Sequence, residues 1–282
     1  MHRILNIAGN DNNKDNLIQQ PKADCIFITS VKADINILSD LCKEGSYSYL
    51  KNNIRALHLS FLRTPAQIDY YFNKTIKYAK IVILRLFGDK GIWSYGLEKL
   101  DHWKNQEGNN LIILSGTEEE DFILNELSTI KTKDSIRISK LLRSGGKINY
   151  NKFLVYIDNL LGSKLIDKNL LDSISYPDPY LYDWEDEKGP NVAVISYKSL
   201  FLANELEVSD HINKLLRSKG ISPKTLFVST LKNINVQNKI KEIVKDNNIR
   251  LILTTTSFNS TLENNQKKSP YDLYEVISVL KF

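Results

Sequence analysis

Short apolar runs alternate with longer amphipathic segments through the first part of the chain. The runs are rich in branched aliphatic side chains and fall at residues 3–8, 25–30, 54–59, 81–87 and 111–115. Short, continuously apolar runs are typical of strands that are covered on both faces. Segments with helical periodicity lie between them, at residues 34–43, 65–78 and 95–105. This alternation predicts βαβ units around a parallel sheet, in a first α/β lobe over residues 1–117.

The second of these helices has a clear start signal. Thr64 stands where a helix N-cap is expected, and Pro65 follows it in the first turn. A threonine oxygen can accept a hydrogen bond from a free amide of the first turn, and proline is tolerated there because its missing amide has no partner in any case. We therefore expect the helix to begin at Pro65.

The pattern changes after residue 117. Helical periodicity alone continues at residues 119–127, 135–142 and 149–161, which predicts a helical connector over residues 118–172. Residues 173–190 contain prolines, acids and aromatics without any period, so they are expected to be a linker. A second α/β lobe is expected over residues 191–282, with strands at 192–197, 225–229 and 250–254 and helices at 205–218 and 236–245.

The second lobe has few predicted strands for an independent doubly wound sheet. Its last apolar run, at residues 276–280, has no helix after it to cover it. Sheets of so few strands with an uncovered end rarely stand alone. We expect this lobe to be incomplete, and the chain to be a fragment, a split gene product or a degenerate relative of a longer protein.

Charge and cysteine content narrow the functional classes. The 38 basic and 33 acidic residues give a net charge of +5, and the basic residues are scattered, so the sequence gives little support for nucleic-acid binding and suits a small anionic ligand equally well. Cys25 and Cys42 lack CxxC spacing, which favours buried reduced thiols over a disulfide or a zinc site. No signal peptide or membrane span is apparent, and a cytoplasmic protein is expected.

The most promising region for a ligand is the end of the run at residues 81–87. The run breaks at Gly88, and a loop with Trp93 and Tyr95 follows, while Arg85 lies within the apolar run itself. In open parallel sheets, ligands bind beyond the carboxyl ends of the strands. Tyr197 and Lys198 follow the first strand of the second lobe in the same way, so all five residues are candidate ligand contacts.

Each candidate also has a structural interpretation. Trp93 and Tyr95 could hold the loop against the sheet by burying aromatic area. Arg85 must be paired, face a cleft or sit at an exposed strand end, because an arginine is rarely buried without a partner. Tyr197 and Lys198 could form an ordinary solvated turn.

The sequence lacks the motifs of a metal or nucleotide site. Its four histidines show no HxH or HExxH pattern, which argues against a stable metal site. No GxxxxGK(S/T) motif is present, and the SGGKIN segment does not follow an expected strand, so this chain is not expected to bind ATP.

Several motifs in order resemble one family, the amino-terminal region of the large (CobN-type) subunit of aerobic cobaltochelatase, which is related to the large subunit of magnesium chelatase. The resemblance covers essentially the whole chain. It rests on a Gly-Gly pair, Gly145 and Gly146, followed by Asn149, and on the segments MHRILNIAGN, TPAQIDYYFNKTIKYAKIVILRLFGDKGIWSYGLEKL and VAVISYKSLFLANELEVSDHINKLLRSKGISPKTLFVSTLKN. The chain departs from the family where Thr64 replaces the histidine of a His-Pro pair and where Lys198 replaces the arginine of a Tyr-Arg pair.

The resemblance implies a specific activity. Members of that family bind hydrogenobyrinic acid a,c-diamide and insert Co2+ into it, as an ATP-dependent ligase that forms nitrogen–metal bonds. In that reaction Co2+ is a substrate, while ATP and Mg2+ are held by AAA-type partner subunits. By resemblance this chain would be part of the large subunit and inactive alone. Two alternatives remain, a non-catalytic binder of tetrapyrroles or small anions and a scaffold for the AAA-type subunits.

Binding such a macrocycle requires an apolar, aromatic-lined cleft with cations for the peripheral carboxylates. Arg85, Trp93, Tyr95, Tyr197 and Lys198 supply these groups, and we expect them to border a hollow shared by the two lobes. Metal insertion also requires a base for the pyrrole protons. No residue of the sequence stands out as that base.

Overall fold

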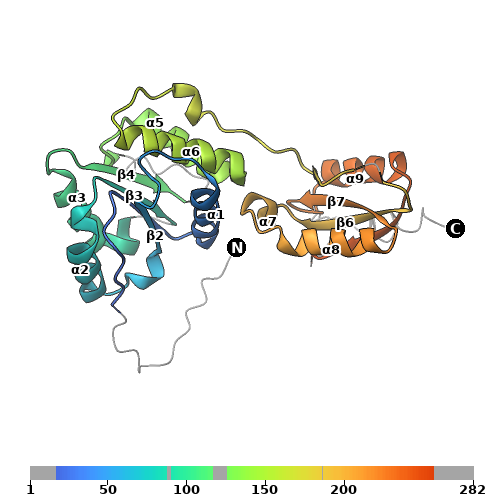
Figure 1. Ribbon diagram of the computed structural model, residues 1–282, viewed down its shortest axis with the longest axis horizontal. Helices are drawn as coiled ribbons and strands as arrows, with labels where there is room; N and C mark the ends of the chain where they lie inside the picture. The colour runs from blue at the N-terminus through green and yellow to red at the C-terminus, as the bar shows by residue number, and fades with distance from the viewer. Residues whose placement is uncertain (1–16, 88–89, 117–125, 186, 257–282) are drawn as a thin grey trace, which may run out of the picture. The chain divides into compact units, whose positions relative to one another are not determined.

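The protein consists of two compact units in a computed structural model that describes residues 17–87, 90–116, 126–185 and 187–256. The first unit takes residues 1–143 and 149–173, and the second takes residues 144–148 and 174–282. Each has a sheet with helices on its faces (Figure 1), which confirms the predicted α/β class. The runs predicted as strands at 3–8 and 276–280, and most of the helix predicted at 119–127, lie outside the described residues.

The sheet of the first unit has four parallel strands in the order β2-β1-β3-β4. Their bounds are β1 (Cys25–Thr29), β2 (Ile54–His58), β3 (Ile81–Leu86) and β4 (Asn110–Ser115). Thr29 is in register with His58 on one side and with Arg85 on the other. The carboxyl ends of these three strands are therefore level with one another.

Helices cover both faces of this sheet, as buried strands require. One face carries α1 (Lys32–Glu44), α5 (Thr132–Ser144) and α6 (Gly146–Leu161), and the other carries α2 (Pro65–Lys74) and α3 (Ser94–Lys104) (Figure 1). Side chains alternate between two cores, with Phe27 on the α1 side and Ile28 on the α2 side. The helices α5 and α6 come from the segment that we expected to be a connector, and they pack on the first sheet.

The start of α2 confirms the sequence signal. Thr64 is the N-cap, its hydroxyl accepts a hydrogen bond from the amide of Gln67, and the Gln67 side chain accepts one from the amide of Thr64. This reciprocal pair is a capping box. The helix ends at Lys74, earlier than predicted, and a separate 3-10 turn follows; the 3-10 turns of the described residues are Leu59–Phe61, Ile76–Tyr78, Lys90–Trp93 and Lys168–Leu171.

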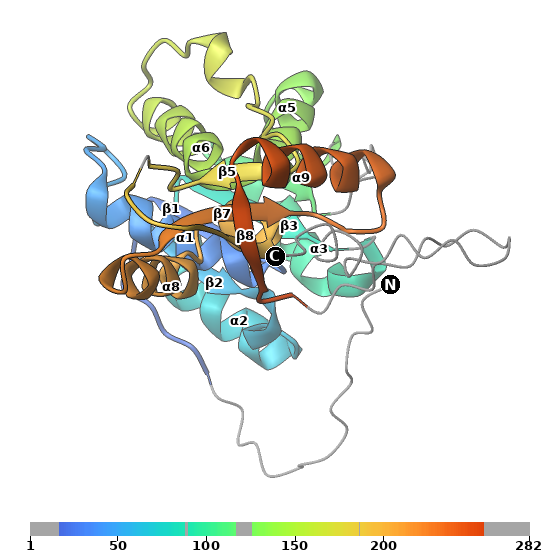
Figure 2. The same ribbon diagram turned by 90° about the vertical axis from the view of Figure 1, so that its right-hand side faces the viewer.

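The sheet of the second unit has the order β5-β7-β6-β8. Three of its strands are parallel, β6 (Asn191–Tyr197), β7 (Ser222–Val228) and β8 (Ile249–Thr254), and β5 (Tyr180–Tyr182) is antiparallel to β7. The short helix α7 (Lys198–Leu202) follows β6, while α8 (Glu207–Ser218) and α9 (Ile234–Asp246) lie on opposite faces of the sheet (Figure 2). The expected linker at 173–190 thus contributes an edge strand.

The two units share one strand order. In each, the first parallel strand is central, the second lies on one side of it and the third on the other. Such an order creates a switch point between the first and third strands, where the crossovers diverge and ligands commonly bind. The switch points lie between β1 and β3 and between β6 and β8. None of the helices in the described ranges has the length and apolarity needed to cross a bilayer.

Candidate functional site

A buried polar cluster occupies the switch point of the first unit. Arg85, near the end of β3, forms an ion pair with Asp34 in the first turn of α1, with 2.6 Å between Nη1 and Oδ1. The two side chains are 6% and 0% exposed. The hydroxyl of Tyr150 on α6 donates to the same carboxylate and accepts from Arg85 at 3.1 Å, and Thr29 donates to Asp34 at 2.6 Å. Four elements therefore meet at one carboxylate.

Burial makes this cluster dependent on its pairing, because an isolated buried charge is costly. Burial, and then the negative charge of Asp34, raise the pKa of Tyr150, so its hydroxyl stays protonated and able to donate. Nε of Arg85 has no hydrogen-bond partner among the described residues. The structure thus gives Arg85 the internal pair that its structural interpretation requires, and its contact with a ligand stays a prediction.

Sequence reasoning missed the partners of Arg85. A signal for Asp34 was present, because an arginine in an apolar strand calls for a carboxylate and Asp34 follows the first predicted strand. Tyr150 carried no such signal. It reaches the cluster only because α6 packs across the sheet, which the assignment of that helix to a connector concealed.

Trp93 and Tyr95 lie on the other face of the first sheet, in the core with α2 and α3. Trp93 is buried, and its indole Nε1 donates to the carbonyl of Leu62 at 2.9 Å. Gly96 makes room for it, since a Cβ there would lie 2.3 Å from the indole ring. The Tyr95 hydroxyl donates to Asp69 on α2 at 2.8 Å. Both aromatics hold the start of α3 against α2, and their predicted contact with a ligand stays a prediction.

Tyr197 and Lys198 lie beside the switch point of the second unit. Tyr197 ends β6 and is the N-cap residue of α7, and Lys198 begins that helix. The Lys198 ammonium donates to the carbonyl of Tyr176 at 2.9 Å. Across the switch point, the hydroxyls of Ser196 and Thr255 are 2.8 Å apart. Both candidates are half-buried, so they stand at the surface of the unit.

Tyr176, whose backbone carbonyl accepts from this lysine, belongs to a group of aromatic rings. Tyr180 and Phe201 stack with ring centroids 4.0 Å apart, and Tyr176 meets Phe201 edge-on at 5.0 Å. Tyr182 and Phe227 extend the group, which we call the aromatic cluster. All of its members except Phe227 are only half-buried. Tyr176, Tyr180 and Tyr182 fall in the predicted linker, but their convergence with Phe201 and Phe227 depends on β5 and α7, which were not predicted.

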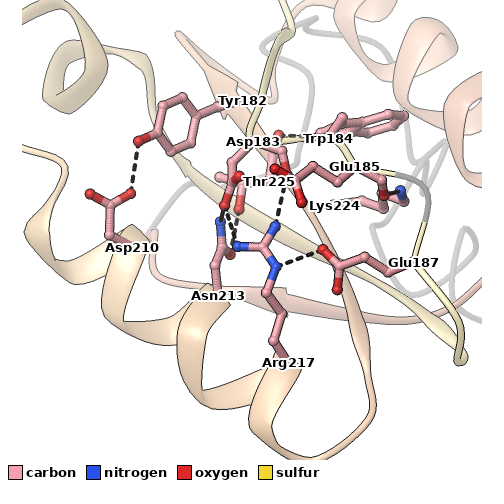
Figure 3. A network of polar contacts seen from close by, with 10 residues as sticks. All are labelled: Tyr182, Asp183, Trp184, Glu185, Glu187, Asp210, Asn213, Arg217, Lys224 and Thr225. Atoms are coloured by element: carbon pink, nitrogen blue, oxygen red, sulfur yellow. Dashed lines mark hydrogen bonds and ion pairs between the residues drawn. The ribbon is translucent and has the colours of Figure 1, made fainter.

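A polar network fixes β5 and the residues after it to α8 and β7 (Figure 3). Arg217 lies at its centre and forms ion pairs of 2.7 Å with Asp183 and 2.6 Å with Glu187. Asn213 donates to Asp183 at 2.9 Å and accepts from Thr225 at 2.8 Å. The remaining contacts join Tyr182 to Asp210, Trp184 to the carbonyl of Thr225 and Lys224 to the carbonyl of Glu185.

The network also sets the charge of its central acid. Burial by itself would raise the pKa of Asp183, but the hydrogen bonds from Arg217 and Asn213 outweigh burial and lower it. Burial and the hydrogen bond to Asp210 raise the pKa of Tyr182. The carboxylates here are neutralised within the protein, so this network supports the aromatic cluster and is a poor candidate for catalysis.

The described ranges hold no group of three or more His, Cys, Asp or Glu side chains that could bind a metal ion. The predicted lack of a metal site in the whole chain stays a prediction. The hollow expected between the lobes also stays a prediction. No residue is assigned as the base.

Comparisons with known proteins give one consistent result. The family model CobN/Magnesium Chelatase matches residues 139–279. A protein of Pseudomonas aeruginosa named aerobic cobaltochelatase subunit CobN is 22% identical over 257 residues, which cover 86% of this chain and 20% of that protein. The protein of the same name from a Sinorhizobium species is 23% identical over 280 residues, covering 92% of this chain and 22% of that protein.

A solved structure shares the fold. The catalytic subunit of cobaltochelatase from Mycobacterium tuberculosis aligns with a TM-score of 0.62 and 18% identity, over 84% of this chain and 18% of that one. The chain therefore spans about a fifth of the length of the relatives that it matches.

Proposed function

Because the chain belongs to the CobN/magnesium chelatase family, we propose that it is part of a cobaltochelatase large subunit that binds hydrogenobyrinic acid a,c-diamide. In this proposal Co2+ is a substrate, and its insertion forms nitrogen–metal bonds in an ATP-dependent ligase reaction. AAA-type partner subunits hold the ATP and Mg2+. The chain contributes binding and docking and is not active alone.

The observation that carries the proposal is the surface around Lys198. A flat macrocycle with carboxylates at its rim needs aromatic faces for its body and cations for its edge. The aromatic cluster offers half-buried rings, and the Lys198 ammonium contacts the Tyr176 carbonyl beside them. Tyr197 lies next to this lysine at the end of β6. These features support contact with the macrocycle at the second switch point.

Arg85, Trp93 and Tyr95 enter the proposal as contacts from the first unit. Arg85 lies at the first switch point, where its Nε has no partner among the described residues and could donate to a carboxylate. Trp93 and Tyr95 shape the start of α3, next to the loop that follows β3.

Binding of the macrocycle is tested by titration. We expect hydrogenobyrinic acid a,c-diamide to quench the tryptophan fluorescence saturably. Lys198→Met should raise the dissociation constant about tenfold or more, because a charged hydrogen bond is worth about 1.5–3 kcal/mol. Lys219→Met, at an exposed lysine after α8, is the matched control and should bind as the unsubstituted chain does. Absence of saturable quenching would refute the proposal.

Insertion assays separate a chelatase part from a simple binder or a scaffold. The chain is mixed with the AAA-type subunits, ATP, Mg2+ and Co2+, and the same mixture is completed with a full-length large subunit. We expect insertion only in the completed mixture, with the added chain competing for the macrocycle. A scaffold would not compete with the full-length large subunit for the macrocycle and would act on the partner subunits alone.

We also propose a cytoplasmic location. Cys25 and Cys42 are both unpaired thiols, one buried and one half-buried. Reduced thiols of this kind are usual in a reducing compartment.

A further inference from the structure

A groove of about 490 Å³ lies at the outer edge of the first unit, between α1 and β2. It is formed by residues of α1, of the turn before β2 and of β2 itself. Its lining is Ile35, Leu38, Ser39, Cys42, Lys43, Lys51, Asn52, Ile54, Arg55 and Ala56. Its volume falls within the range of about 300–1,000 Å³ that is usual for small-molecule sites.

The floor of the groove is apolar. Leu38 belongs to the core on this face of the sheet, and Ile54 and Ala56 pack against its margin. Burial raises the pKa of Cys42, so its thiol is neutral and adds to the apolar floor. β2 is an edge strand, and no strand lies beyond it in the part of the chain that the structure describes.

The rim of the groove is positively charged. Lys43, Lys51 and Arg55 are its only charged lining residues, and no carboxylate is among them. Arg55 alternates with Ile54 and Ala56 along β2, and its guanidinium donates to the backbone carbonyls of Pro21 and Asn52, so the positive charge of the rim comes from Lys43 and Lys51. Clefts with low-dielectric walls and one sign of charge concentrate counter-ions. An anion is the expected occupant of this rim.

The groove is separate from the first switch point. Lys43 lies in the last turn of α1 and Lys51 precedes β2, so both are at the amino end of the sheet. Asp34 and Arg85 lie at the carboxyl end. A ligand in the groove would not contact the buried polar cluster.

We propose that this groove binds a small amphipathic anion, with an apolar body on Leu38, Ile54 and Ala56 and an acidic group at Lys43 and Lys51. Its volume is that of a small-molecule site. Carboxylate, sulfonate and phosphate share the required chemistry. The proposal is independent of the chelatase function and would stand if that function failed.

Two fluorescent probes that differ by one charge test the site. 1-Anilinonaphthalene-8-sulfonate carries a sulfonate, and N-phenyl-1-naphthylamine has the same aromatic body without it. We expect saturable one-to-one binding of the sulfonate, weakened about tenfold by the double variant Lys43→Glu, Lys51→Glu, and little change for the neutral probe. Raising the salt concentration should weaken the sulfonate alone.

Matched variants distinguish the groove from other surfaces. Lys140→Glu together with Lys133→Glu reverses two exposed lysines on α5, which matches the charge change of the double variant, and should leave both probes unaffected. Ser39→Trp fills the groove from its exposed rim and should block both probes, whereas Ser39→Ala should not. All variants must keep the melting temperature of the unsubstituted chain. If the Lys43, Lys51 variant does not, Lys51→Glu alone replaces it. Unchanged sulfonate binding in the Lys43, Lys51 variant, or equal weakening by the Lys133, Lys140 variant, would overturn the proposal.

Discussion

Arg85 shows how a single charge within an apolar strand organises the residues around it. Its guanidinium is buried at the end of β3, and Asp34 supplies the opposing charge from α1. Thr29 and Tyr150 supply further hydrogen bonds to the same carboxylate. Removing one partner of a buried ion pair destabilises the fold strongly, because the other charge stays buried without compensation. The four residues therefore act as one group.

Removal of the arginine should therefore destabilise the first unit strongly. We expect Arg85→Met to lower the free energy of unfolding by about 3–5 kcal/mol, because Asp34 keeps its buried charge without a cation. Urea unfolding followed by fluorescence measures this in a Trp184→Phe background, where Trp93 and Trp103 report on the first unit alone. Lys80→Met breaks the exposed ion pair with Asp24 and should cost less than about 1 kcal/mol. Equal effects of the two substitutions would contradict the argument.

Asp183 gives the second unit a dependence on acid. Its pKa is lowered in the folded state, so its ionised form adds stability above the ordinary value of about 4, and that contribution is lost as the pH falls through the lowered value. We expect Asp183→Asn to be less stable than the unsubstituted chain at pH 7. The difference in melting temperature should shrink as the pH is lowered below about 4. A difference that is constant across this range would show that the carboxylate charge contributes nothing.

At the scale of elements, α2 depends on its N-cap. We expect Thr64→Ala to destabilise the first unit by about 1 kcal/mol, because the amide of Gln67 loses its partner. Thr64→Ser keeps the hydroxyl and should stay within a few tenths of a kcal/mol of the unsubstituted chain. Urea unfolding in the Trp184→Phe background again provides the measurement. If serine and alanine behave alike, the cap hydrogen bond is not the source of stability.

The sequence was most informative where local chemistry decides the structure. The buried strands were visible as short apolar runs, and the cap of α2 was visible in Thr64 and Pro65. β5 was missed because it has three residues and gains its place from β7 and from the network around Arg217. The same limit applies to the candidate site. Arg85 and Lys198 could be chosen from the sequence, but their partners Tyr150 and Tyr176 come from elements whose packing the sequence pattern did not reveal.

At the scale of the whole molecule, two units carry the same strand order within one chain. Each has a central first strand and a switch point beside it, and the candidate residues of each unit lie at or near the carboxyl ends of its strands. The first unit also includes α5 and α6, which complete one of its cores. The order of the strands therefore places possible ligand contacts independently in both units.

The attachment of Tyr182, Asp183 and Glu187 to α8 decides where the second unit could be excised. A fragment of residues 188–282 would lack β5 and both carboxylates that Arg217 binds, leaving a half-buried guanidinium without a counter-ion and exposing the edge of β7. A fragment of residues 174–282 would retain them. We expect cooperative thermal unfolding, followed by circular dichroism, from the longer fragment only, although the shorter one begins closer to the first parallel strand. The true amino-terminal border of this unit thus lies inside a stretch whose prolines and acids make it look dispensable.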